Sequence, residues 1–460
     1  MTRAAFLVLV LASAARAGDP EVKFEKYRLP NGLTVILSED HRLPQVAVDI
    51  WYHVGAANQT PGHSGFAHLF EHMMFSGSKH VQPDFHSTLS ALGISDYNGT
   101  TNFDRTNYFE LLPSNQLAAA LWLEADRMGY LLDTLGEQKL KVQRDVVSNE
   151  KRQNTENRPY GMAGQRLCDL LFPKPHPYYE CVIGDIADVQ AASLPDIRNF
   201  FRADYGPQNA SLAVVGDFDA KVAKDLVEKY FATLPRGPEV KLPDVPQPEI
   251  KGLVKETFED KLAEEPRLQL VWKGVRAFAD EEPAGDVLAD VLGTGRTSRL
   301  YKALVFDKQL ASGVGVGDVT LGIAGWFQIT VTAARGHDIP ELLPVVQQIL
   351  AEVKKNGVTL EEVERAKRNI LAGKLRTVER IGGFGGKADL LNEYQTYLGD
   401  PGFLPRDLAR YRAVTPQAVQ AFANKYLVDD KFIELDIEPQ KKSAAAAGNN
   451  SRGNNSGGAR

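Results

Sequence analysis

The chain has 460 residues, of which 43% are hydrophobic and 24% are charged, and its formal net charge is −6. This length suggests two or three domains. The composition is that of an ordinary globular protein, which excludes disordered, collagen-like and membrane-spanning chains. The slightly acidic balance offers no basic surface for nucleic acid or anionic lipid, so we expect no nucleic-acid partner.

The first residues have the pattern of a secretory signal peptide. Arg3 is followed by the uncharged, mostly apolar run Ala4 to Ala15 and then by small residues around Arg16. We therefore predict that residues 1–17 are a signal peptide and that the mature protein is periplasmic. The alternative, a mitochondrial presequence, would spread arginines along an amphipathic helix. The run is shorter than the about 20 apolar residues of a membrane span, so we expect none.

Two segments of unusual composition divide the remaining chain. Residues 234–252 contain five prolines and are expected to form an extended linker. Residues 443–460 contain only Ala, Gly, Asn, Ser and two Arg, and such a segment cannot bury enough apolar surface to fold. We therefore predict an N-terminal domain at 18–233, a C-terminal domain at 253–442 and a disordered tail at 443–460.

The two predicted domains resemble each other near their ends. Each has a helix pattern that begins at a proline, where the missing N–H costs nothing, and that leads to a tyrosine and an apolar strand. Four matching pairs lie 221 positions apart: Pro195 and Pro416, Phe201 and Phe422, Tyr205 and Tyr426, and Leu212 and Ile433. Repeated matches in one context indicate duplication of a domain.

Hydrophobic periodicity indicates the content of each domain. Pro30-Asn31-Gly32 between two strand patterns predicts a hairpin. Further strands are predicted at 46–54, 267–272 and 326–333, and helices at 64–74, 117–131, 137–153, 342–355 and 360–378. Hairpins followed by runs of helices predict an α+β fold of two homologous domains, each a mainly antiparallel sheet with helices packed on one face.

Six of the nine histidines fall between His53 and His86, and among them stands His68-Leu69-Phe70-Glu71-His72. On a helix, His68 and His72 lie on one face about one turn apart and can share one zinc ion. Glu71 would project beside the metal, where a carboxylate can act as a general base.

The alternative reading of this motif is a solvated helix face. The neighbouring residues favour a buried helix, because they are apolar on nearly every side. They are Phe66, Leu69, Phe70, Met73, Met74 and Phe75. Buried histidine and glutamate side chains need a partner, and a cation supplies one.

Catalytic zinc usually takes three protein ligands, and Glu150 is the candidate for the third. In the predicted helix 137–153 it extends the apolar stripe formed by Leu140, Val146 and Val147. A carboxylate in line with a buried stripe needs a partner. Alternatively, Glu150 pairs with Arg144 or Lys151 or faces water, and the spacing does not decide. Asp145 and Glu156 lie off the stripe and are weaker candidates.

Cys168 and Cys181 are the chain's two cysteines. Two cysteines are too few for a disulfide scaffold or a four-cysteine zinc module. In an oxidising compartment they could form a disulfide, and otherwise they would be two separate buried thiols. Their spacing does not decide, because pairing depends on geometry.

The order His-x-x-Glu-His is the inverzincin signature. With its surroundings, the sequence resembles the insulinase/pitrilysin family of zinc metallopeptidases, especially half-length members similar to processing peptidases. The motifs that carry the resemblance are Leu29–Val35, Gly65–Gly77, Asp145–Glu150, Asn157–Gly161, Ile183–Gly184 and Tyr205–Leu212. The resemblance as a whole covers nearly all of the chain after the predicted signal peptide.

The resemblance implies one zinc ion per chain, with His68, His72 and Glu150 as metal ligands and Glu71 as catalytic base. It also implies a substrate-binding edge strand, to which an extended peptide adds by backbone hydrogen bonds. Its residues would be Asn98, Thr100, Thr101 and Asn102. For Asn98, an ordinary Asn-Gly turn is the alternative.

The sequence departs from the family pattern in two places. Gln143 stands where the family often has a second glutamate. In the second half, Lys308 and Ser312 stand where self-sufficient members carry an arginine and a tyrosine that bind the substrate carbonyl. No second His-x-x-Glu-His occurs there. This pattern resembles the zinc-bearing subunit of a heterodimer, whose partner would be a homologous zinc-free subunit.

The resemblance thus implies a zinc-dependent endopeptidase that hydrolyses unfolded peptides in a closed chamber and needs its partner for activity. The alternative is a non-catalytic core or scaffold subunit of a heteromeric complex. A scaffold has no need for His68, Glu71, His72 and Glu150, and the chain has all four. A metal-binding module without catalysis is a third possibility, which would bind zinc and cleave nothing.

Overall fold

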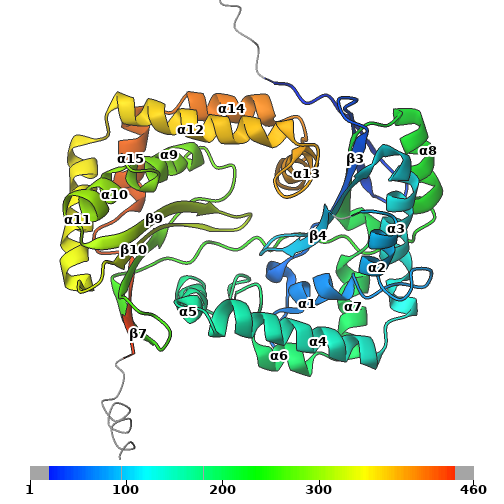
Figure 1. Cartoon of the computed structure of the whole chain (residues 1–460), viewed down its shortest axis with the longest axis horizontal. Coiled ribbons are helices and arrows are strands. Elements are labelled where there is room, and N and C mark those ends of the chain that lie inside the picture. Colours follow the sequence, from blue (N-terminus) through cyan, green and yellow to red (C-terminus); the bar gives the residue numbers. More distant parts are fainter. Residues whose placement is uncertain (1–19, 95, 180, 441–460) are drawn as a thin grey trace, which may run out of the picture.

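The computed structural model describes residues 20–94, 96–179 and 181–440. The predicted signal peptide and the predicted tail lie outside these residues. Two sheets, one in each half of the chain, are surrounded by helices (Figure 1). The α+β fold predicted from the sequence is confirmed. Within the described ranges, no helix combines the length and the apolar character needed to cross a membrane.

The first sheet has six strands in the order β1-β2-β6-β3-β5-β4. Neighbours are antiparallel except β2 and β6, and β1 and β2 form the predicted hairpin. The strands are β1 (Glu25–Arg28), β2 (Thr34–Glu39), β3 (Gln45–Tyr52), β4 (Asp96–Thr101), β5 (Thr106–Pro113) and β6 (Ala210–Gly216). β6 is buried along its whole length because it lies inside the sheet. β4 is an edge strand.

The second sheet repeats this topology. Its order is β7-β11-β8-β10-β9, and only β7 and β11 are parallel. The strands are β7 (Val254–Asp260), β8 (Arg267–Lys273), β9 (Ala311–Thr320), β10 (Gly325–Ala333) and β11 (Ile433–Pro439). Without β1, the first sheet has the same order, so β7, β11, β8, β10 and β9 correspond to β2, β6, β3, β5 and β4. The predicted homology of the two domains is confirmed.

The predicted helices 64–74, 117–131 and 137–153 correspond to α1, α3 and α4, whose ends differ by at most two residues. The helices of the first half are η1 (Ala56–Asn58), α1 (Phe66–Met73), α2 (Phe85–Ala91), η2 (Ser114–Gln116), α3 (Leu117–Tyr130), η3 (Leu131–Asp133), α4 (Glu137–Lys151), the π-helical turn η4 (Arg152–Glu156), α5 (Gly161–Leu171), α6 (Ile186–Ala191), α7 (Leu194–Asp204), η5 (Pro207–Asn209) and α8 (Ala220–Phe231).

The second half has a similar run of helices. They are α9 (Glu282–Gly293), α10 (Arg299–Tyr301), the π-helical turn η6 (Lys302–Asp307), α11 (Ile339–Asn356), α12 (Leu360–Glu379), α13 (Lys387–Leu398), α14 (Leu404–Arg412) and α15 (Pro416–Tyr426). Pro195 and Pro416 both lie in the first turns of helices, α7 and α15. A side chain caps each of these helices, as the duplicated pattern predicts.

Each half packs one of its helices against the sheet of the other half, in addition to the helices that cover its own sheet. In the second half, α13 packs Ala388 and Leu391 against the apolar side chains of the first sheet, among them Ala47. In return, α5 of the first half packs Ala163 against Leu435 of the second sheet. Both faces of the first sheet are therefore covered, and the halves are held together by buried apolar contacts.

The proline-rich segment between α8 and β7 has neither helix nor strand. Its prolines prevent regular pairing, yet its apolar side chains are not free. Leu242, Val245 and Ile250 pack against a buried cluster that includes Phe172 and Ile323. The segment thus follows the surface between the halves.

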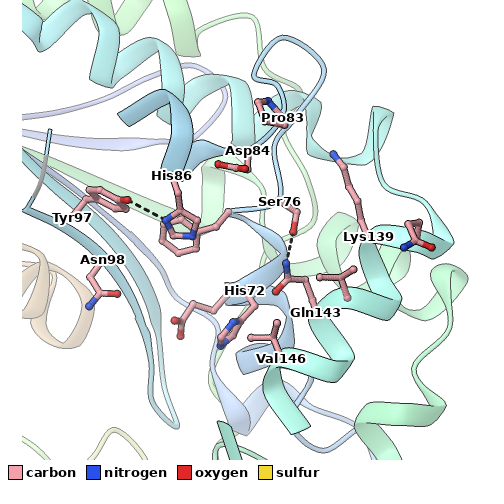
Figure 2. Close-up of a pocket in the computed structure, with 14 residues that line it drawn as sticks. His72, Ser76, Pro83, Asp84, His86, Tyr97, Asn98, Lys139, Gln143 and Val146 are labelled. Carbon is pink, nitrogen blue, oxygen red and sulfur yellow. Dashed lines mark hydrogen bonds between the residues drawn. The ribbon is translucent and has the colours of Figure 1, made fainter. Parts of the chain in front are cut away.

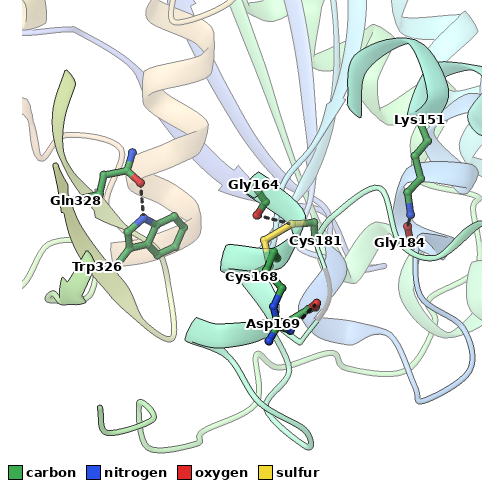
Figure 3. Close-up of a disulfide and its surroundings, with 9 residues drawn as sticks. Lys151, Gly164, Cys168, Asp169, Cys181, Gly184, Trp326 and Gln328 are labelled. Atoms are coloured by element: carbon green, nitrogen blue, oxygen red, sulfur yellow. Dashed lines mark hydrogen bonds and ion pairs between the residues drawn. A yellow bond between two sulfur atoms is a disulfide. The ribbon is translucent and has the colours of Figure 1, made fainter. Parts of the chain in front are cut away.

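Cys168 and Cys181 form a disulfide, so the alternative of two separate thiols is wrong (Figure 3). The bridge joins α5 to the loop that precedes α6. The loop makes a turn from Cys181 to Gly184, in which the N–H of Gly184 donates to the Cys181 carbonyl at 2.8 Å. The disulfide therefore restrains the loop between α5 and α6.

We predict that replacing both cysteines by serine lowers the free energy of unfolding by about 3 kcal/mol, because the bridge restricts a short loop in the unfolded chain. Urea unfolding of the double variant and of the oxidised wild type measures the difference. Reducing agent should lower the stability of the wild type and leave the variant unchanged. Equal stability of the double variant and the oxidised wild type would contradict the prediction.

Candidate metal centre

The histidines of the predicted motif lie on α1, a helix enclosed by the first half. It starts at Gly65, whose left-handed conformation (φ 79°) suits glycine. Phe66, Leu69, Phe70 and Met73 are buried, as predicted. The spacing of four residues places His68 and His72 on one face, with ring centroids 4.8 Å apart.

Glu150 lies across this face, near the end of α4. Its Oε2 is 3.1 Å from His72 Nε2 and 3.7 Å from His68 Nε2. Zinc–ligand distances of about 2.0–2.1 Å in a tetrahedron place neighbouring ligand atoms about 3.3 Å apart. The two separations from Glu150 are compatible with one tetrahedral cation between the three side chains, and two imidazoles with a carboxylate suit zinc.

The alternative partners of Glu150 are used elsewhere. Arg144 pairs with Glu137 at 3.6 Å and donates to the Gln190 carbonyl at 2.8 Å. Lys151 is buried and donates from Nζ to the Gly184 carbonyl at 2.5 Å. Neither cation neutralises Glu150, whose polar neighbours are the two imidazoles and the side-chain amide of Asn154.

Glu71 is a second carboxylate close to the histidines. Ligand atoms of His68, Glu71 and His72 lie within 4.8 Å of one another, the only such group in the described ranges. Glu71 is nevertheless the weaker candidate for the third ligand. Its Oε2 accepts a hydrogen bond from Thr101 Oγ1 at 2.5 Å, whereas Glu150 approaches both Nε2 atoms more closely. Glu71 is thus held beside the cation position.

The protonation of these groups suits a cation site. Burial, with the neighbouring His72, lowers the pKa of His68 to about 4, so the ring is neutral and can bind a metal. The adjoining His72 lowers the pKa of the Glu150 carboxyl, so this group is ionised. Burial raises the pKa of Glu71, as expected for a carboxyl enclosed by helix and strand.

The predicted substrate strand is β4, which passes Glu71. Asn98, Thr100 and Thr101 lie on it, and Asn98 pairs with Phe109 within the ladder, so the alternative Asn-Gly turn is wrong. Asn102 instead lies in the turn after β4, where its Oδ1 accepts from the N–H groups of Asp104 and Arg105. In the described part of the chain, β4 pairs only with β5, so its other edge is free.

A pocket of about 780 Å³ opens beside Glu71 and His72, between α1, β4 and α4 (Figure 2). Aromatic and apolar side chains, among them Phe75, Tyr97 and Val146, line it together with polar ones such as Asn98 and Lys139. Gln143, at the position of the family's second glutamate, donates to Ser76 Oγ at 3.0 Å. This amide therefore connects α4 to the end of α1 instead of adding a negative charge.

One loop fixes α1 relative to α4. Gly184 accepts the hydrogen bond from Lys151, and a Cβ on Gly184 would collide with the backbone of Gly65. Four residues later, Asp188 accepts hydrogen bonds from the N–H and hydroxyl of Ser64. The loop thus touches the residue after Glu150 and the start of the histidine helix, and the disulfide restrains it.

Sequence reasoning missed two residues that position the candidate ligand Glu150 and its helix. Asn154 Nδ2, in the π-helical turn after α4, donates to Glu150 Oε1 at 3.3 Å. Lys151 binds a carbonyl in a loop 33 residues away. The i,i+4 spacing of Glu150 and Asn154 was a detectable signal. The Lys151 contact had no signal, because it depends on tertiary structure.

In the second half, Lys308 directly follows η6, and Ser312 lies in β9. The Ser312 hydroxyl donates to the Ala333 carbonyl at 3.1 Å. It is therefore used to join β9 to β10.

We predict that Asn154→Ala weakens zinc binding about 10- to 100-fold, because groups that hydrogen-bond a metal ligand typically contribute this much. Competition with a chromogenic chelator measures the affinity. The matched control is Asn149→Ala, since Asn149 lies on α4 and its side chain accepts from Arg152 instead. An equal effect of both variants, or no effect of either, would contradict the assigned contact.

Comparison with known proteins shows which family has a similar sequence. Residues 34–167 match the family described as Insulinase (Peptidase family M16), and residues 191–370 match the Peptidase M16 inactive domain. The zinc protease PqqE of Helicobacter pylori is 30% identical over 380 residues, which cover 81% of this chain and 84% of that protein.

Solved structures of peptidases have a similar fold. A protease from Helicobacter pylori has a TM-score of 0.85 at 27% identity, covering 91% of this chain and 100% of that one. The periplasmic protease PqqL from Escherichia coli has a similar fold, with a TM-score of 0.75 at 19% identity, and the match covers 92% of this chain and 48% of that one. The chain therefore belongs to the insulinase family of peptidases, peptidase family M16.

Proposed function

We propose that this chain is a zinc-dependent endopeptidase in which His68, His72 and Glu150 bind the metal and Glu71 is the general base. The observation that carries the proposal is the approach of one Glu150 oxygen to both imidazoles, at 3.1 and 3.7 Å, beside a glutamate that is not needed as a ligand. The naming of a relative at 30% identity as a zinc protease supports it.

Zinc, when bound, would lower the pKa of a water molecule to about 7 and polarise the substrate carbonyl. The residues of the chain position the groups that transfer the proton. Thr101 holds Oε2 of Glu71, which leaves Oε1 to accept a proton from the attacking water. Glu71 then returns this proton to the amine that leaves when the peptide bond breaks.

The free edge of β4 supports a peptide in extended conformation as the substrate. A peptide that pairs with β4 forms backbone hydrogen bonds regardless of its sequence, and only an unfolded segment has these groups free. Asn98, Thr100 and Thr101 lie along the strand. Since Thr101 touches Glu71, the bond to be cleaved would lie beside the end of β4. A closed chamber between the two halves would admit only unfolded chains.

We predict that Glu71→Gln retains zinc and lowers the hydrolysis of a quenched fluorescent peptide by at least about 10²-fold, because a positioned general base contributes about 10²–10⁴. Zinc content and kcat are measured on the same preparation. Glu137→Gln is the matched control, since Glu137 lies on α4 with 73% of its side chain exposed. Unchanged turnover in Glu71→Gln would refute the role of Glu71.

A homologous zinc-free subunit would complete the enzyme, and its location would be the periplasm. Lys308 and Ser312 replace the arginine and tyrosine that bind the substrate carbonyl in self-sufficient members, and the hydroxyl of Ser312 is used within the sheet. The PqqL chain, described as periplasmic, is about twice the matched length, which is consistent with a second unit of this size. A separate partner chain would take that place here.

We predict that the chain purified from its own cells carries a homologue of similar length that lacks His-x-x-Glu-His. Adding this partner should raise kcat by at least about 10²-fold, because one missing oxyanion donor costs about 10²–10³. Assays of the two chains, separate and mixed, measure the effect. Full activity of this chain alone would exclude the heterodimer. Zinc binding without cleavage by the mixture would support the non-catalytic scaffold instead.

A further inference from the structure

A glycine-rich loop of the second half, Ile381 to Gly386, lies against the first sheet between α12 and α13. Gly383 and Gly385 have φ values of 76° and 62°, which other residues rarely adopt. A Cβ on Gly382 would collide with Ala47 of β3. Glycine is therefore required for the conformation of the loop and for its contact with the sheet.

Hydrogen bonds hold the loop in one shape. Arg380 Nη2 donates to the carbonyls of Phe384 and Gly385, at 2.9 and 3.1 Å. The N–H of Gly385 donates to Asp389 Oδ2 at 3.0 Å, and Asp389 also accepts from Trp51 of β3 at 3.1 Å. The loop is thus fixed to the sheet before any ligand binds.

The loop presents one aromatic ring. Phe384 is 53% exposed and lies edge-on to Phe109 of β5, which is buried, with ring centroids 4.8 Å apart. Burying such a side chain fully would contribute about 1.5–3 kcal/mol. Beside it is a pocket of about 580 Å³ lined by the loop, Leu111 and Asp96, among others.

Some of the charged groups at this pocket are paired, and two carboxylates, those of Asp96 and Glu379, are exposed. Asp40 pairs with Arg42 and with Lys387, each at 2.6 Å. The Arg380 guanidinium donates to the loop's own carbonyls. The open surface therefore presents the Phe384 ring beside the exposed carboxylates of Asp96 and Glu379, which disfavour an acidic side chain and leave the ring available to an apolar one.

The sheet register connects this surface to the substrate strand. Asp96 pairs with Leu111 and Asn98 with Phe109, so these side chains share one face of the sheet. Thr101 is on the alternate set of positions and touches Glu71. A peptide paired with β4 would direct every second side chain toward the face of Phe109 and Phe384.

We propose that Phe384, supported by the buried Phe109, and the adjoining pocket bind a large apolar side chain of the peptide substrate. Asp96 lies about three to five strand positions from the Gly99–Thr101 segment beside Glu71, or about 10–17 Å. The bound residue is therefore three to five residues from the cleaved bond. This inference rests on the proposed function, because β4 must be the substrate strand.

The test uses fluorescein-labelled ten-residue peptides of one sequence, in which phenylalanine replaces alanine at each position in turn. Binding is measured by anisotropy to zinc-loaded Glu71→Gln protein, and cleavage by the active enzyme with its partner. Phenylalanine at one position, three to five residues from the cleaved bond, should improve binding and kcat/KM about tenfold, the lower end of what an apolar pocket contributes.

Phe384→Ala should abolish this preference and leave the all-alanine peptide unaffected, whereas Phe384→Leu should retain part of it. Leu360→Ala, an exposed apolar side chain on α12, is the control. An unchanged preference in Phe384→Ala, an equal loss for every peptide, or a preference for lysine would overturn the inference. Position-specific binding of the peptide, with no cleavage by the zinc-loaded wild type and its partner, would contradict the proposed function. It would still support Phe384 and its pocket as a binding surface.

Discussion

The convergence of the Glu150 carboxylate on the two α1 imidazoles is the contact on which the proposed function depends. Glu150 is about eighty positions from the histidines, so α4 must cross α1 at a fixed angle and height. The fixing groups are Lys151 and Gly184, with Gly65 at the start of α1. A cation between these half-buried groups would satisfy all three of them at once, and neither Arg144 nor Lys151 takes that place.

The same helix couples this centre to the edge of the sheet. Glu71 lies one position before His72 and reaches Thr101 on β4, so the base and the strand are joined by a hydrogen bond. The sheet behind β4 is supported on both faces, by its own helices and by α13 of the second half. Duplication thus does more than repeat a domain, because the second half stabilises the sheet of the first half and carries the loop with Phe384.

Much of this arrangement was predictable from local patterns. The pair His68 and His72 follows from helical spacing, and the duplication of the domain was indicated by residues 221 positions apart. Glu150 was ambiguous by spacing alone, because its stripe fits a metal ligand and a surface ion pair equally well. The Cys168–Cys181 bridge, the turn role of Asn102 and the exchange of α5 and α13 could not be predicted. Each depends on the distance between segments that only the folded chain determines.

Zinc-edge X-ray absorption of the purified protein, prepared without chelators, tests the central claim most directly. We expect one zinc per chain, bound by two imidazole nitrogens and oxygen at about 2.0–2.1 Å, and loss of this spectrum in Glu150→Ala. A protein that holds no zinc under these conditions, or one whose zinc spectrum is the same without Glu150, would contradict the account.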